Sequence, residues 1–184
     1  MIKEKILIFK NINLKNTISI LLVIGILSGI FGFIYETIFY KIDLGYFVKR
    51  GSTFGPCIPI YFFGGIFILL FSYRFRKHPI LVLIINCLVT GLLEYATGFV
   101  LFEFFNTRLW DYNTEIWNFG NINGYICLRS ILFFGISSLF LVYLVTPIIL
   151  KIVNKIDEKK FQIISYIITG IFILDIITYT IIKY

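Results

Sequence analysis

The feature that most constrains this chain is a series of long apolar runs separated by short polar segments. A helix needs about 20 apolar residues to cross the hydrocarbon core of a bilayer. Five runs approach or exceed that length, at about residues 17–40, 55–73, 79–105, 125–150 and 161–182. With 59% hydrophobic and 15% charged residues, the 184-residue chain has more apolar surface than its interior could cover, so the surplus must face lipid. The runs exclude an ordinary soluble domain.

The runs predict an all-α fold: a polytopic membrane helix bundle of about five transmembrane helices, forming a single integral membrane domain over residues 1–184. The first run follows four lysines and so resembles the start of a secretory signal peptide. It is longer than a signal peptide's apolar region and has no small-residue cleavage motif behind it, so we expect it to remain in the protein. Five crossings place the two termini on opposite sides of the membrane.

The basic residues indicate the orientation, because short loops retain Lys and Arg on the cytoplasmic side. With the N-terminus inside, the inner segments hold eleven basic residues and the outer segments hold six. The inner set is Lys3, Lys5, Lys10, Lys15, Arg74, Arg76, Lys77, Lys151, Lys155, Lys159 and Lys160, and the outer set is Lys41, Lys49, Arg50, Arg108, Arg129 and Lys183. We therefore expect a cytoplasmic N-terminus and an outer C-terminus, with the basic pair at residues 49 and 50 opposing the count.

Charge, cysteines and missing motifs narrow the classes of function. The net charge of +7 lies between the apolar runs, so it indicates topology and contact with anionic lipid head groups, not nucleic-acid binding. Three separated cysteines and a single histidine form no metal-ligand spacing, and we expect neither a metal nor another cofactor. The chain has no GxxxxGK[ST] phosphate loop, so ATP-driven activity would need a separate ATPase.

Two of the runs carry a carboxyl on a face of small or polar side chains. In the first run, Glu36 shares a helix face with three glycines that suit close packing, namely Gly25, Gly29 and Gly32. In the third run, Glu94 lies on a polar stripe with Asn86, Thr90 and Thr97. A charged residue within the bilayer costs about 2.5–3.5 kcal/mol on insertion scales and usually faces a bundle interior or an aqueous path. Glu94 is either a functional site or a neutral, hydrogen-bonded structural residue, and Asp175 in the last run poses the same choice.

Basic and aromatic side chains fall at the same predicted depth as these carboxyls. In the inferred topology all of them occupy the outer leaflet, where they could line one polar pocket. A carboxyl in hydrocarbon tends to be neutral while Arg stays protonated, so we expect the pocket to attract an anion or an anionic head group. The alternative is that each Arg is already paired with a carboxylate. The candidate substrate-binding residues are Glu36, Arg50, Glu94, Asp111, Tyr112 and Arg129.

The segment KRGSTFGPCIPIYFFGG, residues 49–65, combines several glycines with two prolines at the start of the second run. Gly and Pro interrupt regular helix, and irregular backbone at membrane depth is tolerated only where protein or a cavity surrounds it. One interpretation is a broken or re-entrant start of the second span. The other is an ordinary loop followed by a Pro at a helix start.

A set of ordered motifs resembles one family of bacterial membrane proteins. The set comprises Glu36, KRGSTFGPCIPIY at 49–61, EYATG at 94–98, WDY at 110–112, NING at 121–124 and ICL at 126–128. Together, over residues 25–145, these motifs resemble the ABC-transporter type IV permease family. The resemblance implies a multi-pass protein of the bacterial cytoplasmic membrane, grouped with transporters. The sequence departs from the family pattern at Phe62, where Gly is common, and at Tyr125, where Arg is common, which leaves Arg129 as the positive partner.

Three functions are compatible with these features. The first is a permease-like component of a membrane transport system, which would need self-association, a second membrane subunit or a separate ATPase. The second is an intramembrane enzyme acting on a lipid or lipid-linked substrate, with Glu94 or Asp111 as general base and Arg50 or Arg129 holding an anionic head group. The third is a non-transporting scaffold or accessory subunit. The chain lacks a Ser/His or Cys/His pair, which argues against the enzyme.

Overall fold

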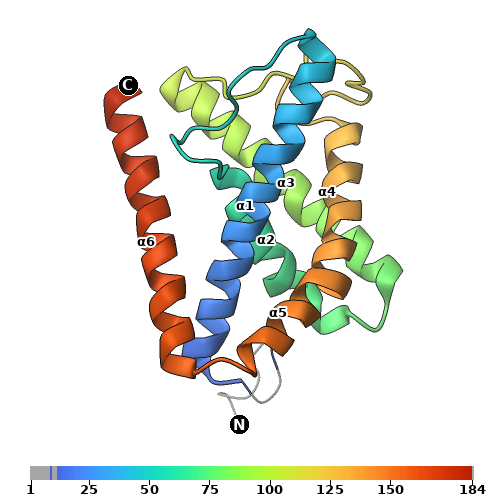
Figure 1. Cartoon of the computed structure of the whole chain (residues 1–184). Helices are drawn as coiled ribbons and strands as arrows, with labels where there is room; N and C mark the ends of the chain where they lie inside the picture. Colours follow the sequence, from blue (N-terminus) through green and yellow to red (C-terminus); the bar gives the residue numbers. More distant parts are fainter. Residues whose placement is uncertain (1–8, 10–11, 184) are drawn as a thin grey trace.

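In the part of the chain that the structure describes, the fold consists of six α-helices and two short irregular helical turns (Figure 1). In chain order they are α1 (Leu14–Leu44), α2 (Pro59–Ser72), η2 (Tyr73–Phe75), α3 (Pro79–Phe105), α4 (Leu128–Phe140), η3 (Leu141–Val145), α5 (Thr146–Val153) and α6 (Glu158–Lys183). The structure is a computed structural model that describes residue 9 and residues 12–183. The predictions for Lys3, Lys5 and Lys10 lie outside the described residues. We call the end of the bundle where α1 begins the lower end and the end where α1 finishes the upper end.

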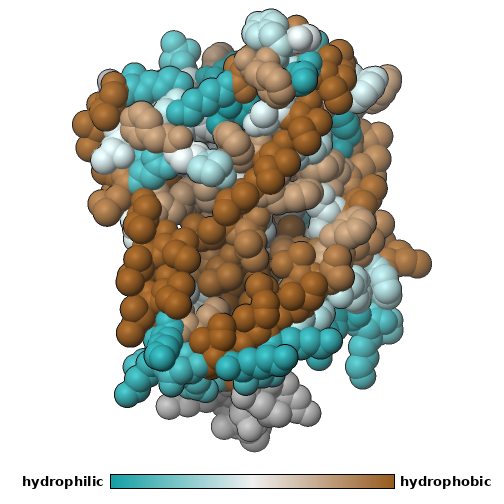
Figure 2. Space-filling model, in the orientation of Figure 1, coloured by the Kyte–Doolittle hydropathy of each residue, from teal (hydrophilic) through white to brown (hydrophobic). Residues whose placement is uncertain are grey.

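Among the described residues, four helical segments are long and apolar enough to cross a membrane. They are α1, α3, the continuous segment Leu128–Val153 formed by α4, η3 and α5, and α6. The predicted all-α membrane bundle is confirmed, and the third predicted run coincides with α3. The helices α1 and α6 extend a few residues past their predicted runs, and the segment Leu128–Val153 is shifted by three residues relative to the predicted run 125–150. Figure 2 shows the matching surface, an apolar belt with hydrophilic residues at the upper and lower ends.

The second predicted span differs from the other four because its helix is short. With 14 residues and a rise of 1.5 Å each, α2 covers about 21 Å, less than the ~30 Å of a hydrocarbon core. The backbone before it follows no regular structure from residue 47 and descends along α1. There the amide of Ile58 donates a hydrogen bond of 3.1 Å to the carbonyl of Gly29, midway along α1. The second span therefore has the broken start.

Glycines on α1 permit this close approach. A Cβ on Gly32 would collide with the Tyr61 ring, and a Cβ on Gly29 would collide with Cys57 Sγ. The glycine face predicted from the sequence thus packs against α2 and the irregular segment before it. Asp175 on α6 holds that segment from the other side, accepting hydrogen bonds of 2.8 Å from the amides of Phe54 and Gly55. These contacts satisfy backbone groups that lipid could not.

Local sequence sets the ends of the long helices. Asn13 caps α1, since its side chain accepts a 2.8 Å hydrogen bond from the amide of Asn16, and Gly45 ends the helix with a φ of 82°. Pro79 begins α3, and Asn106 ends it in the left-handed region with a φ of 49°. The π-helical turn η3 precedes Pro147, whose nitrogen cannot donate a helical hydrogen bond.

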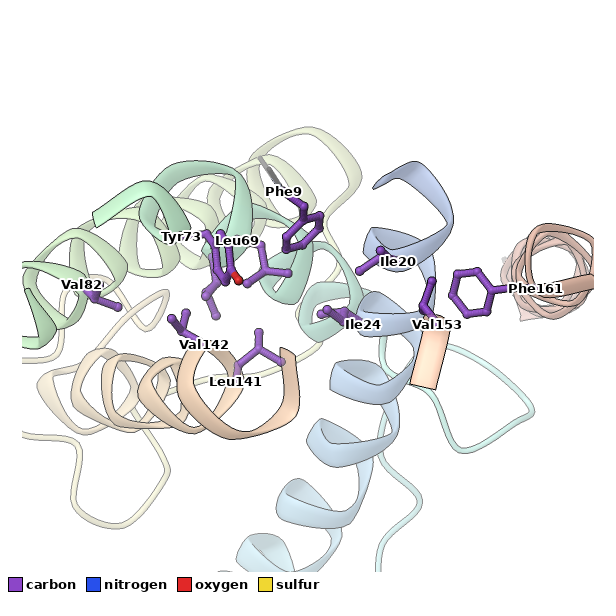
Figure 3. Packing of buried hydrophobic residues seen from close by; sticks show 11 residues of the cluster. Phe9, Ile20, Ile24, Leu69, Tyr73, Val82, Leu141, Val142, Val153 and Phe161 are labelled. Carbon is purple, nitrogen blue, oxygen red and sulfur yellow. The ribbon is translucent and has the colours of Figure 1, made fainter. Parts of the chain in front are cut away.

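The lower end is closed by an apolar cluster to which nearly every helix contributes (Figure 3). Ile20 and Ile24 of α1 lie at its centre with Leu69 of α2, and none of these three side chains is exposed. Val82, Val142 and Phe161 bring α3, η3 and α6 to the same cluster. This cluster fixes the helices at one end and leaves the packing of the other end to different side chains.

Candidate functional site

The connection between α3 and α4, residues 106–127, folds over the upper end of the bundle (Figure 1). The amide of Tyr112 donates to the carbonyl of Gly124 at 3.1 Å, and the indole of Trp110 donates to the carbonyl of Tyr125 at 2.9 Å. Gly124 has a φ of 76°, a left-handed backbone conformation that favours glycine, and a Cβ there would also displace the side-chain ends of Arg108, Asp111 and Asn113. The connection therefore holds Tyr112 and Glu115 in fixed, buried positions.

Beneath this connection lies a small cavity of about 30 Å³ that we call the inner cavity. A volume of that size holds about one or two water molecules. Its polar lining comes from α1, α2, α3, α4 and the connection, namely Tyr35, Glu36, Tyr40, Tyr61, Glu94, Trp110, Tyr112, Glu115, Arg129 and Ser130. Three carboxyls and one guanidinium thus surround a space sized for water.

Arg129 and Glu115 form a buried ion pair at the inner cavity. Arg129 Nη2 lies 2.6 Å from Glu115 Oε2, and the side chains are 16% and 5% exposed. The guanidinium also lies 3.9 Å over the Phe39 ring, and the Tyr40 hydroxyl donates to the other oxygen of Glu115. Because both charges are largely removed from water, each depends on the other for stabilisation.

Among the described residues, Glu94 has no such cationic partner. Its side chain is buried, its Oε1 accepts a hydrogen bond from the Tyr112 hydroxyl, and its Oε2 has no hydrogen-bond partner within the described residues. Burial, and then the nearby Glu94 carboxyl, raise the pKa of Tyr112 well above its ordinary value. Tyr112 therefore remains a neutral phenol that can donate to Glu94.

Glu36 links the inner cavity to a second, larger space. It pairs with Arg50, whose Nε lies 3.0 Å from Glu36 Oε2. The Arg50 guanidinium stacks 3.6 Å over the Tyr40 ring, and its Nη2 donates to the carbonyl of Leu109 at 3.2 Å. The pair therefore joins α1, the irregular segment and the connection at one point.

The larger space, which we call the outer pocket, has a volume of about 530 Å³. Apolar side chains of α2, α3 and α6 form much of its wall, and Glu36 is its only carboxyl within the described residues. Four basic side chains also line it: Lys49, Arg50, Arg108 and Lys183. A volume of this size is in the range of small-molecule sites, and the lining has an excess of positive charge.

The structure brings most of the predicted site residues together. Glu36, Glu94, Tyr112 and Arg129 line the inner cavity, and Arg50 lines the outer pocket beside Glu36. Asp111 lines neither. It pairs with Arg108 at 2.9 Å on the partly exposed surface of the connection.

Some important side chains of the inner cavity were not among the predicted site residues. Glu115 lies in the connection, where no helical or strand period marks it as buried. Tyr40 and Tyr61 belong to apolar helices, where a tyrosine gives no signal of its own. Trp110 and Trp117, both within the connection, are a sequence feature that indicates a packed segment over the bundle.

The remaining chemistry-bearing groups do not form a separate centre. The three cysteines are free thiols, and Cys57 and Cys127 are buried. Within the described residues, no group of three or more His, Cys, Asp or Glu side chains is arranged to hold a metal ion.

Fold and site define a multi-pass membrane protein with a charged pocket at one end of the bundle. The chain matches the family described as "Putative ABC-transporter type IV" over residues 23–180, and it belongs to that family. The resemblance predicted for residues 25–145 is confirmed, and the match extends through most of α6. No curated protein and no solved structure matches the chain with significance.

Proposed function

We propose that this protein is a permease-like component of a membrane transport system and that its outer pocket receives an anionic group. The observation that carries the proposal is the lining of that pocket, with four basic side chains against one carboxyl in a volume of about 530 Å³. Family membership supports a role connected with ABC transporters. A pocket bounded by helices and an irregular segment is also typical of transporter substrate sites.

Lys49 is the basic group best suited to contact a ligand. Arg50 is engaged by Glu36, and Arg108 is engaged by Asp111. Lys49 has no carboxylate partner within the described residues, and its Nζ lies 5.2 Å from the Phe54 ring centre and 5.3 Å from that of Tyr179. An ammonium group held over aromatic rings keeps its charge available to an anion at the pocket.

The proposed orientation places the outer pocket on the outside of a bacterial cytoplasmic membrane. The excess of Lys and Arg in the lower segments supports a cytoplasmic lower end. A separate ATPase or a second membrane subunit would then contact the lower loops, and two copies of the chain could associate in the membrane. Membrane lipids would contact the exposed apolar belt (Figure 2).

Native mass spectrometry of the purified protein tests the pocket. Phosphatidylglycerol should be retained more strongly than phosphatidylcholine, and Lys49→Gln should weaken that preference by about tenfold, the effect of losing one charge-assisted contact. Lys41→Gln is the matched control, because it removes the same charge at the upper end outside the pocket. Glycerol phosphate is then added to distinguish a lipid site from a site for a soluble anion. Only a site for a soluble anion should release its bound lipid when glycerol phosphate competes for it. Equal retention of both lipids in all three proteins, with no effect of glycerol phosphate, would overturn the proposal.

A further inference from the structure

We propose that Glu94 is a reversible proton-binding site, with its proton exchanged through the inner cavity. The inference goes beyond the proposed function, because proton binding at Glu94 needs neither a transported substrate nor a partner subunit. It rests on three observations: the unpartnered oxygen of Glu94 beside a cavity of the size of a water molecule, the ratio of carboxyls to cations around it, and the path from that cavity to the outer pocket.

The first observation is the unequal surroundings of the two carboxyl oxygens. Oε1 accepts from the Tyr112 hydroxyl, and Oε2 has no hydrogen-bond partner within the described residues although Glu94 is 4% exposed. A buried carboxylate oxygen without a donor is costly, whereas a protonated oxygen can donate to a water molecule. The inner cavity lies against this side chain and has room for that water.

The second observation is the charge count around the inner cavity. Two arginines pair with carboxyls of the inner cavity: Arg129, which lines this cavity, pairs with Glu115, and Arg50, which lines the outer pocket, pairs with Glu36. Glu94 is the carboxyl without a direct cation, so one proton balances the cluster when it resides on Glu94. Arg129 Nε and Nη1 have no hydrogen-bond partner in the described part of the chain, and a water in the cavity could join them to Glu94 once the proton leaves.

The third observation is the path to the outer pocket. Glu36, Ile60 and Trp110 line both spaces, so only side chains separate them. The other titratable groups at the cavity are tyrosines, from α1, α2 and the connection, which stay neutral and can pass hydrogen bonds: Tyr35, Tyr40, Tyr61 and Tyr112. A proton leaving Glu94 would pass to water in the cavity and then to the side of the membrane that the outer pocket faces.

Infrared difference spectroscopy of the wild-type protein at stepped pH tests the proposal. The carbonyl band of protonated carboxylic acids should grow reversibly as the pH falls, and one component of this band should be absent in Glu94→Gln. Glu103→Gln is the matched control on the same helix, because that carboxyl accepts from Tyr125 outside the inner cavity, and the component should persist.

A second variant keeps the test decisive if Glu94→Gln fails to fold. Tyr112→Phe removes a donor that favours the ionised carboxyl, so the midpoint of the component should move up by about one to two pH units. A component that is present at every pH would mean a permanently neutral structural acid and would overturn the proposal. Loss of the component on adding Na⁺ in place of K⁺ at constant pH would also overturn it, because a metal cation would then occupy the site.

Discussion

The lower and upper ends of the bundle are built from the same long helices but are packed with different side chains. At the lower end, aliphatic and aromatic residues around Ile24 and Leu69 fill most of the space between the helices, with a few buried polar side chains such as Ser72 and Asn86 among them (Figure 3). At the upper end, ion pairs and tyrosines occupy the equivalent positions and leave two cavities. A cluster of hydrocarbon side chains can fill space without directional contacts, whereas a polar cluster must satisfy each donor and acceptor. The lower end therefore packs the helices together, and the upper end contains the cavities in which a ligand would bind.

The sharpest way to break the upper end is to remove one partner of its buried ion pair. Arg129→Met should lower the free energy of unfolding by about 3–5 kcal/mol, because Glu115 would be left buried and uncompensated. Denaturation in mixed detergent micelles measures the loss.

The double variant Arg129→Met/Glu115→Gln should recover most of that loss, since no unpaired charge remains. A double variant as unstable as the single one would contradict the ion-pair account and would point to packing against Phe39 instead.

The contact between α1 and α2 joins the two ends, and a glycine variant tests it. Gly32→Ala should destabilise the protein by about 1–3 kcal/mol, because the new methyl group collides with the Tyr61 ring beside the inner cavity. Gly170→Ala on α6 is the control, since no atom lies near its added Cβ. Thermal unfolding in detergent compares the two, and equal melting temperatures would show that α1 and α2 are not so closely packed.

A cavity created at the lower end should lower the free energy of unfolding by less than the broken ion pair does. Leu69→Ala removes most of a side chain that has no exposed surface. In a soluble protein such a change costs free energy through lost transfer from water and through the cavity left behind. Because lipid is as apolar as the cluster, mainly the cavity contribution remains here. We expect roughly 1–2 kcal/mol, measured by the same denaturation. A larger cost than that of Arg129→Met would reverse the comparison between the two ends.

The smallest effect is expected on the surface of the connection. Arg108 and Asp111 are 27% and 32% exposed, and such an ion pair contributes at most about 1 kcal/mol. Arg108→Ala should therefore leave the melting temperature nearly unchanged while reducing retention of phosphatidylglycerol, because Arg108 also lines the outer pocket. Unchanged lipid retention would remove Arg108 from the site.

The parts of the fold with a strong sequence period could be predicted, and the parts formed by long-range contacts could not. Apolar length alone indicates α1, α3 and α6, whereas the run of Gly and Pro before Tyr61 is compatible with either a broken start of α2 or an ordinary loop before it. The depth to which that segment descends depends on the hydrogen bond between Ile58 and Gly29, which no local pattern encodes.

The candidate site shows the same division. Glu36 and Glu94 are conspicuous because a carboxyl is costly in an apolar run. Glu115 is not conspicuous in the sequence, because a carboxylate in a loop is usually solvated. Its burial against Arg129 depends on how the connection folds. Asp175 gave a weaker signal, and the structure shows it holding the irregular segment instead of lining a cavity.

We expect the upper end to contain a hydrated, positively charged pocket and the bundle interior below it to be dry. Cysteine reactivity measures both properties at once, in a background with the three native cysteines replaced by alanine. Thr97→Cys places a thiol in the outer pocket, and Ser138→Cys places one at a fully buried position in the bundle interior. After normalisation to free cysteine, an anionic methanethiosulfonate should react at Thr97→Cys about tenfold faster than a cationic one. Neither reagent should react at Ser138→Cys, and equal rates of the two reagents at Thr97→Cys, or no reaction there, would contradict the account.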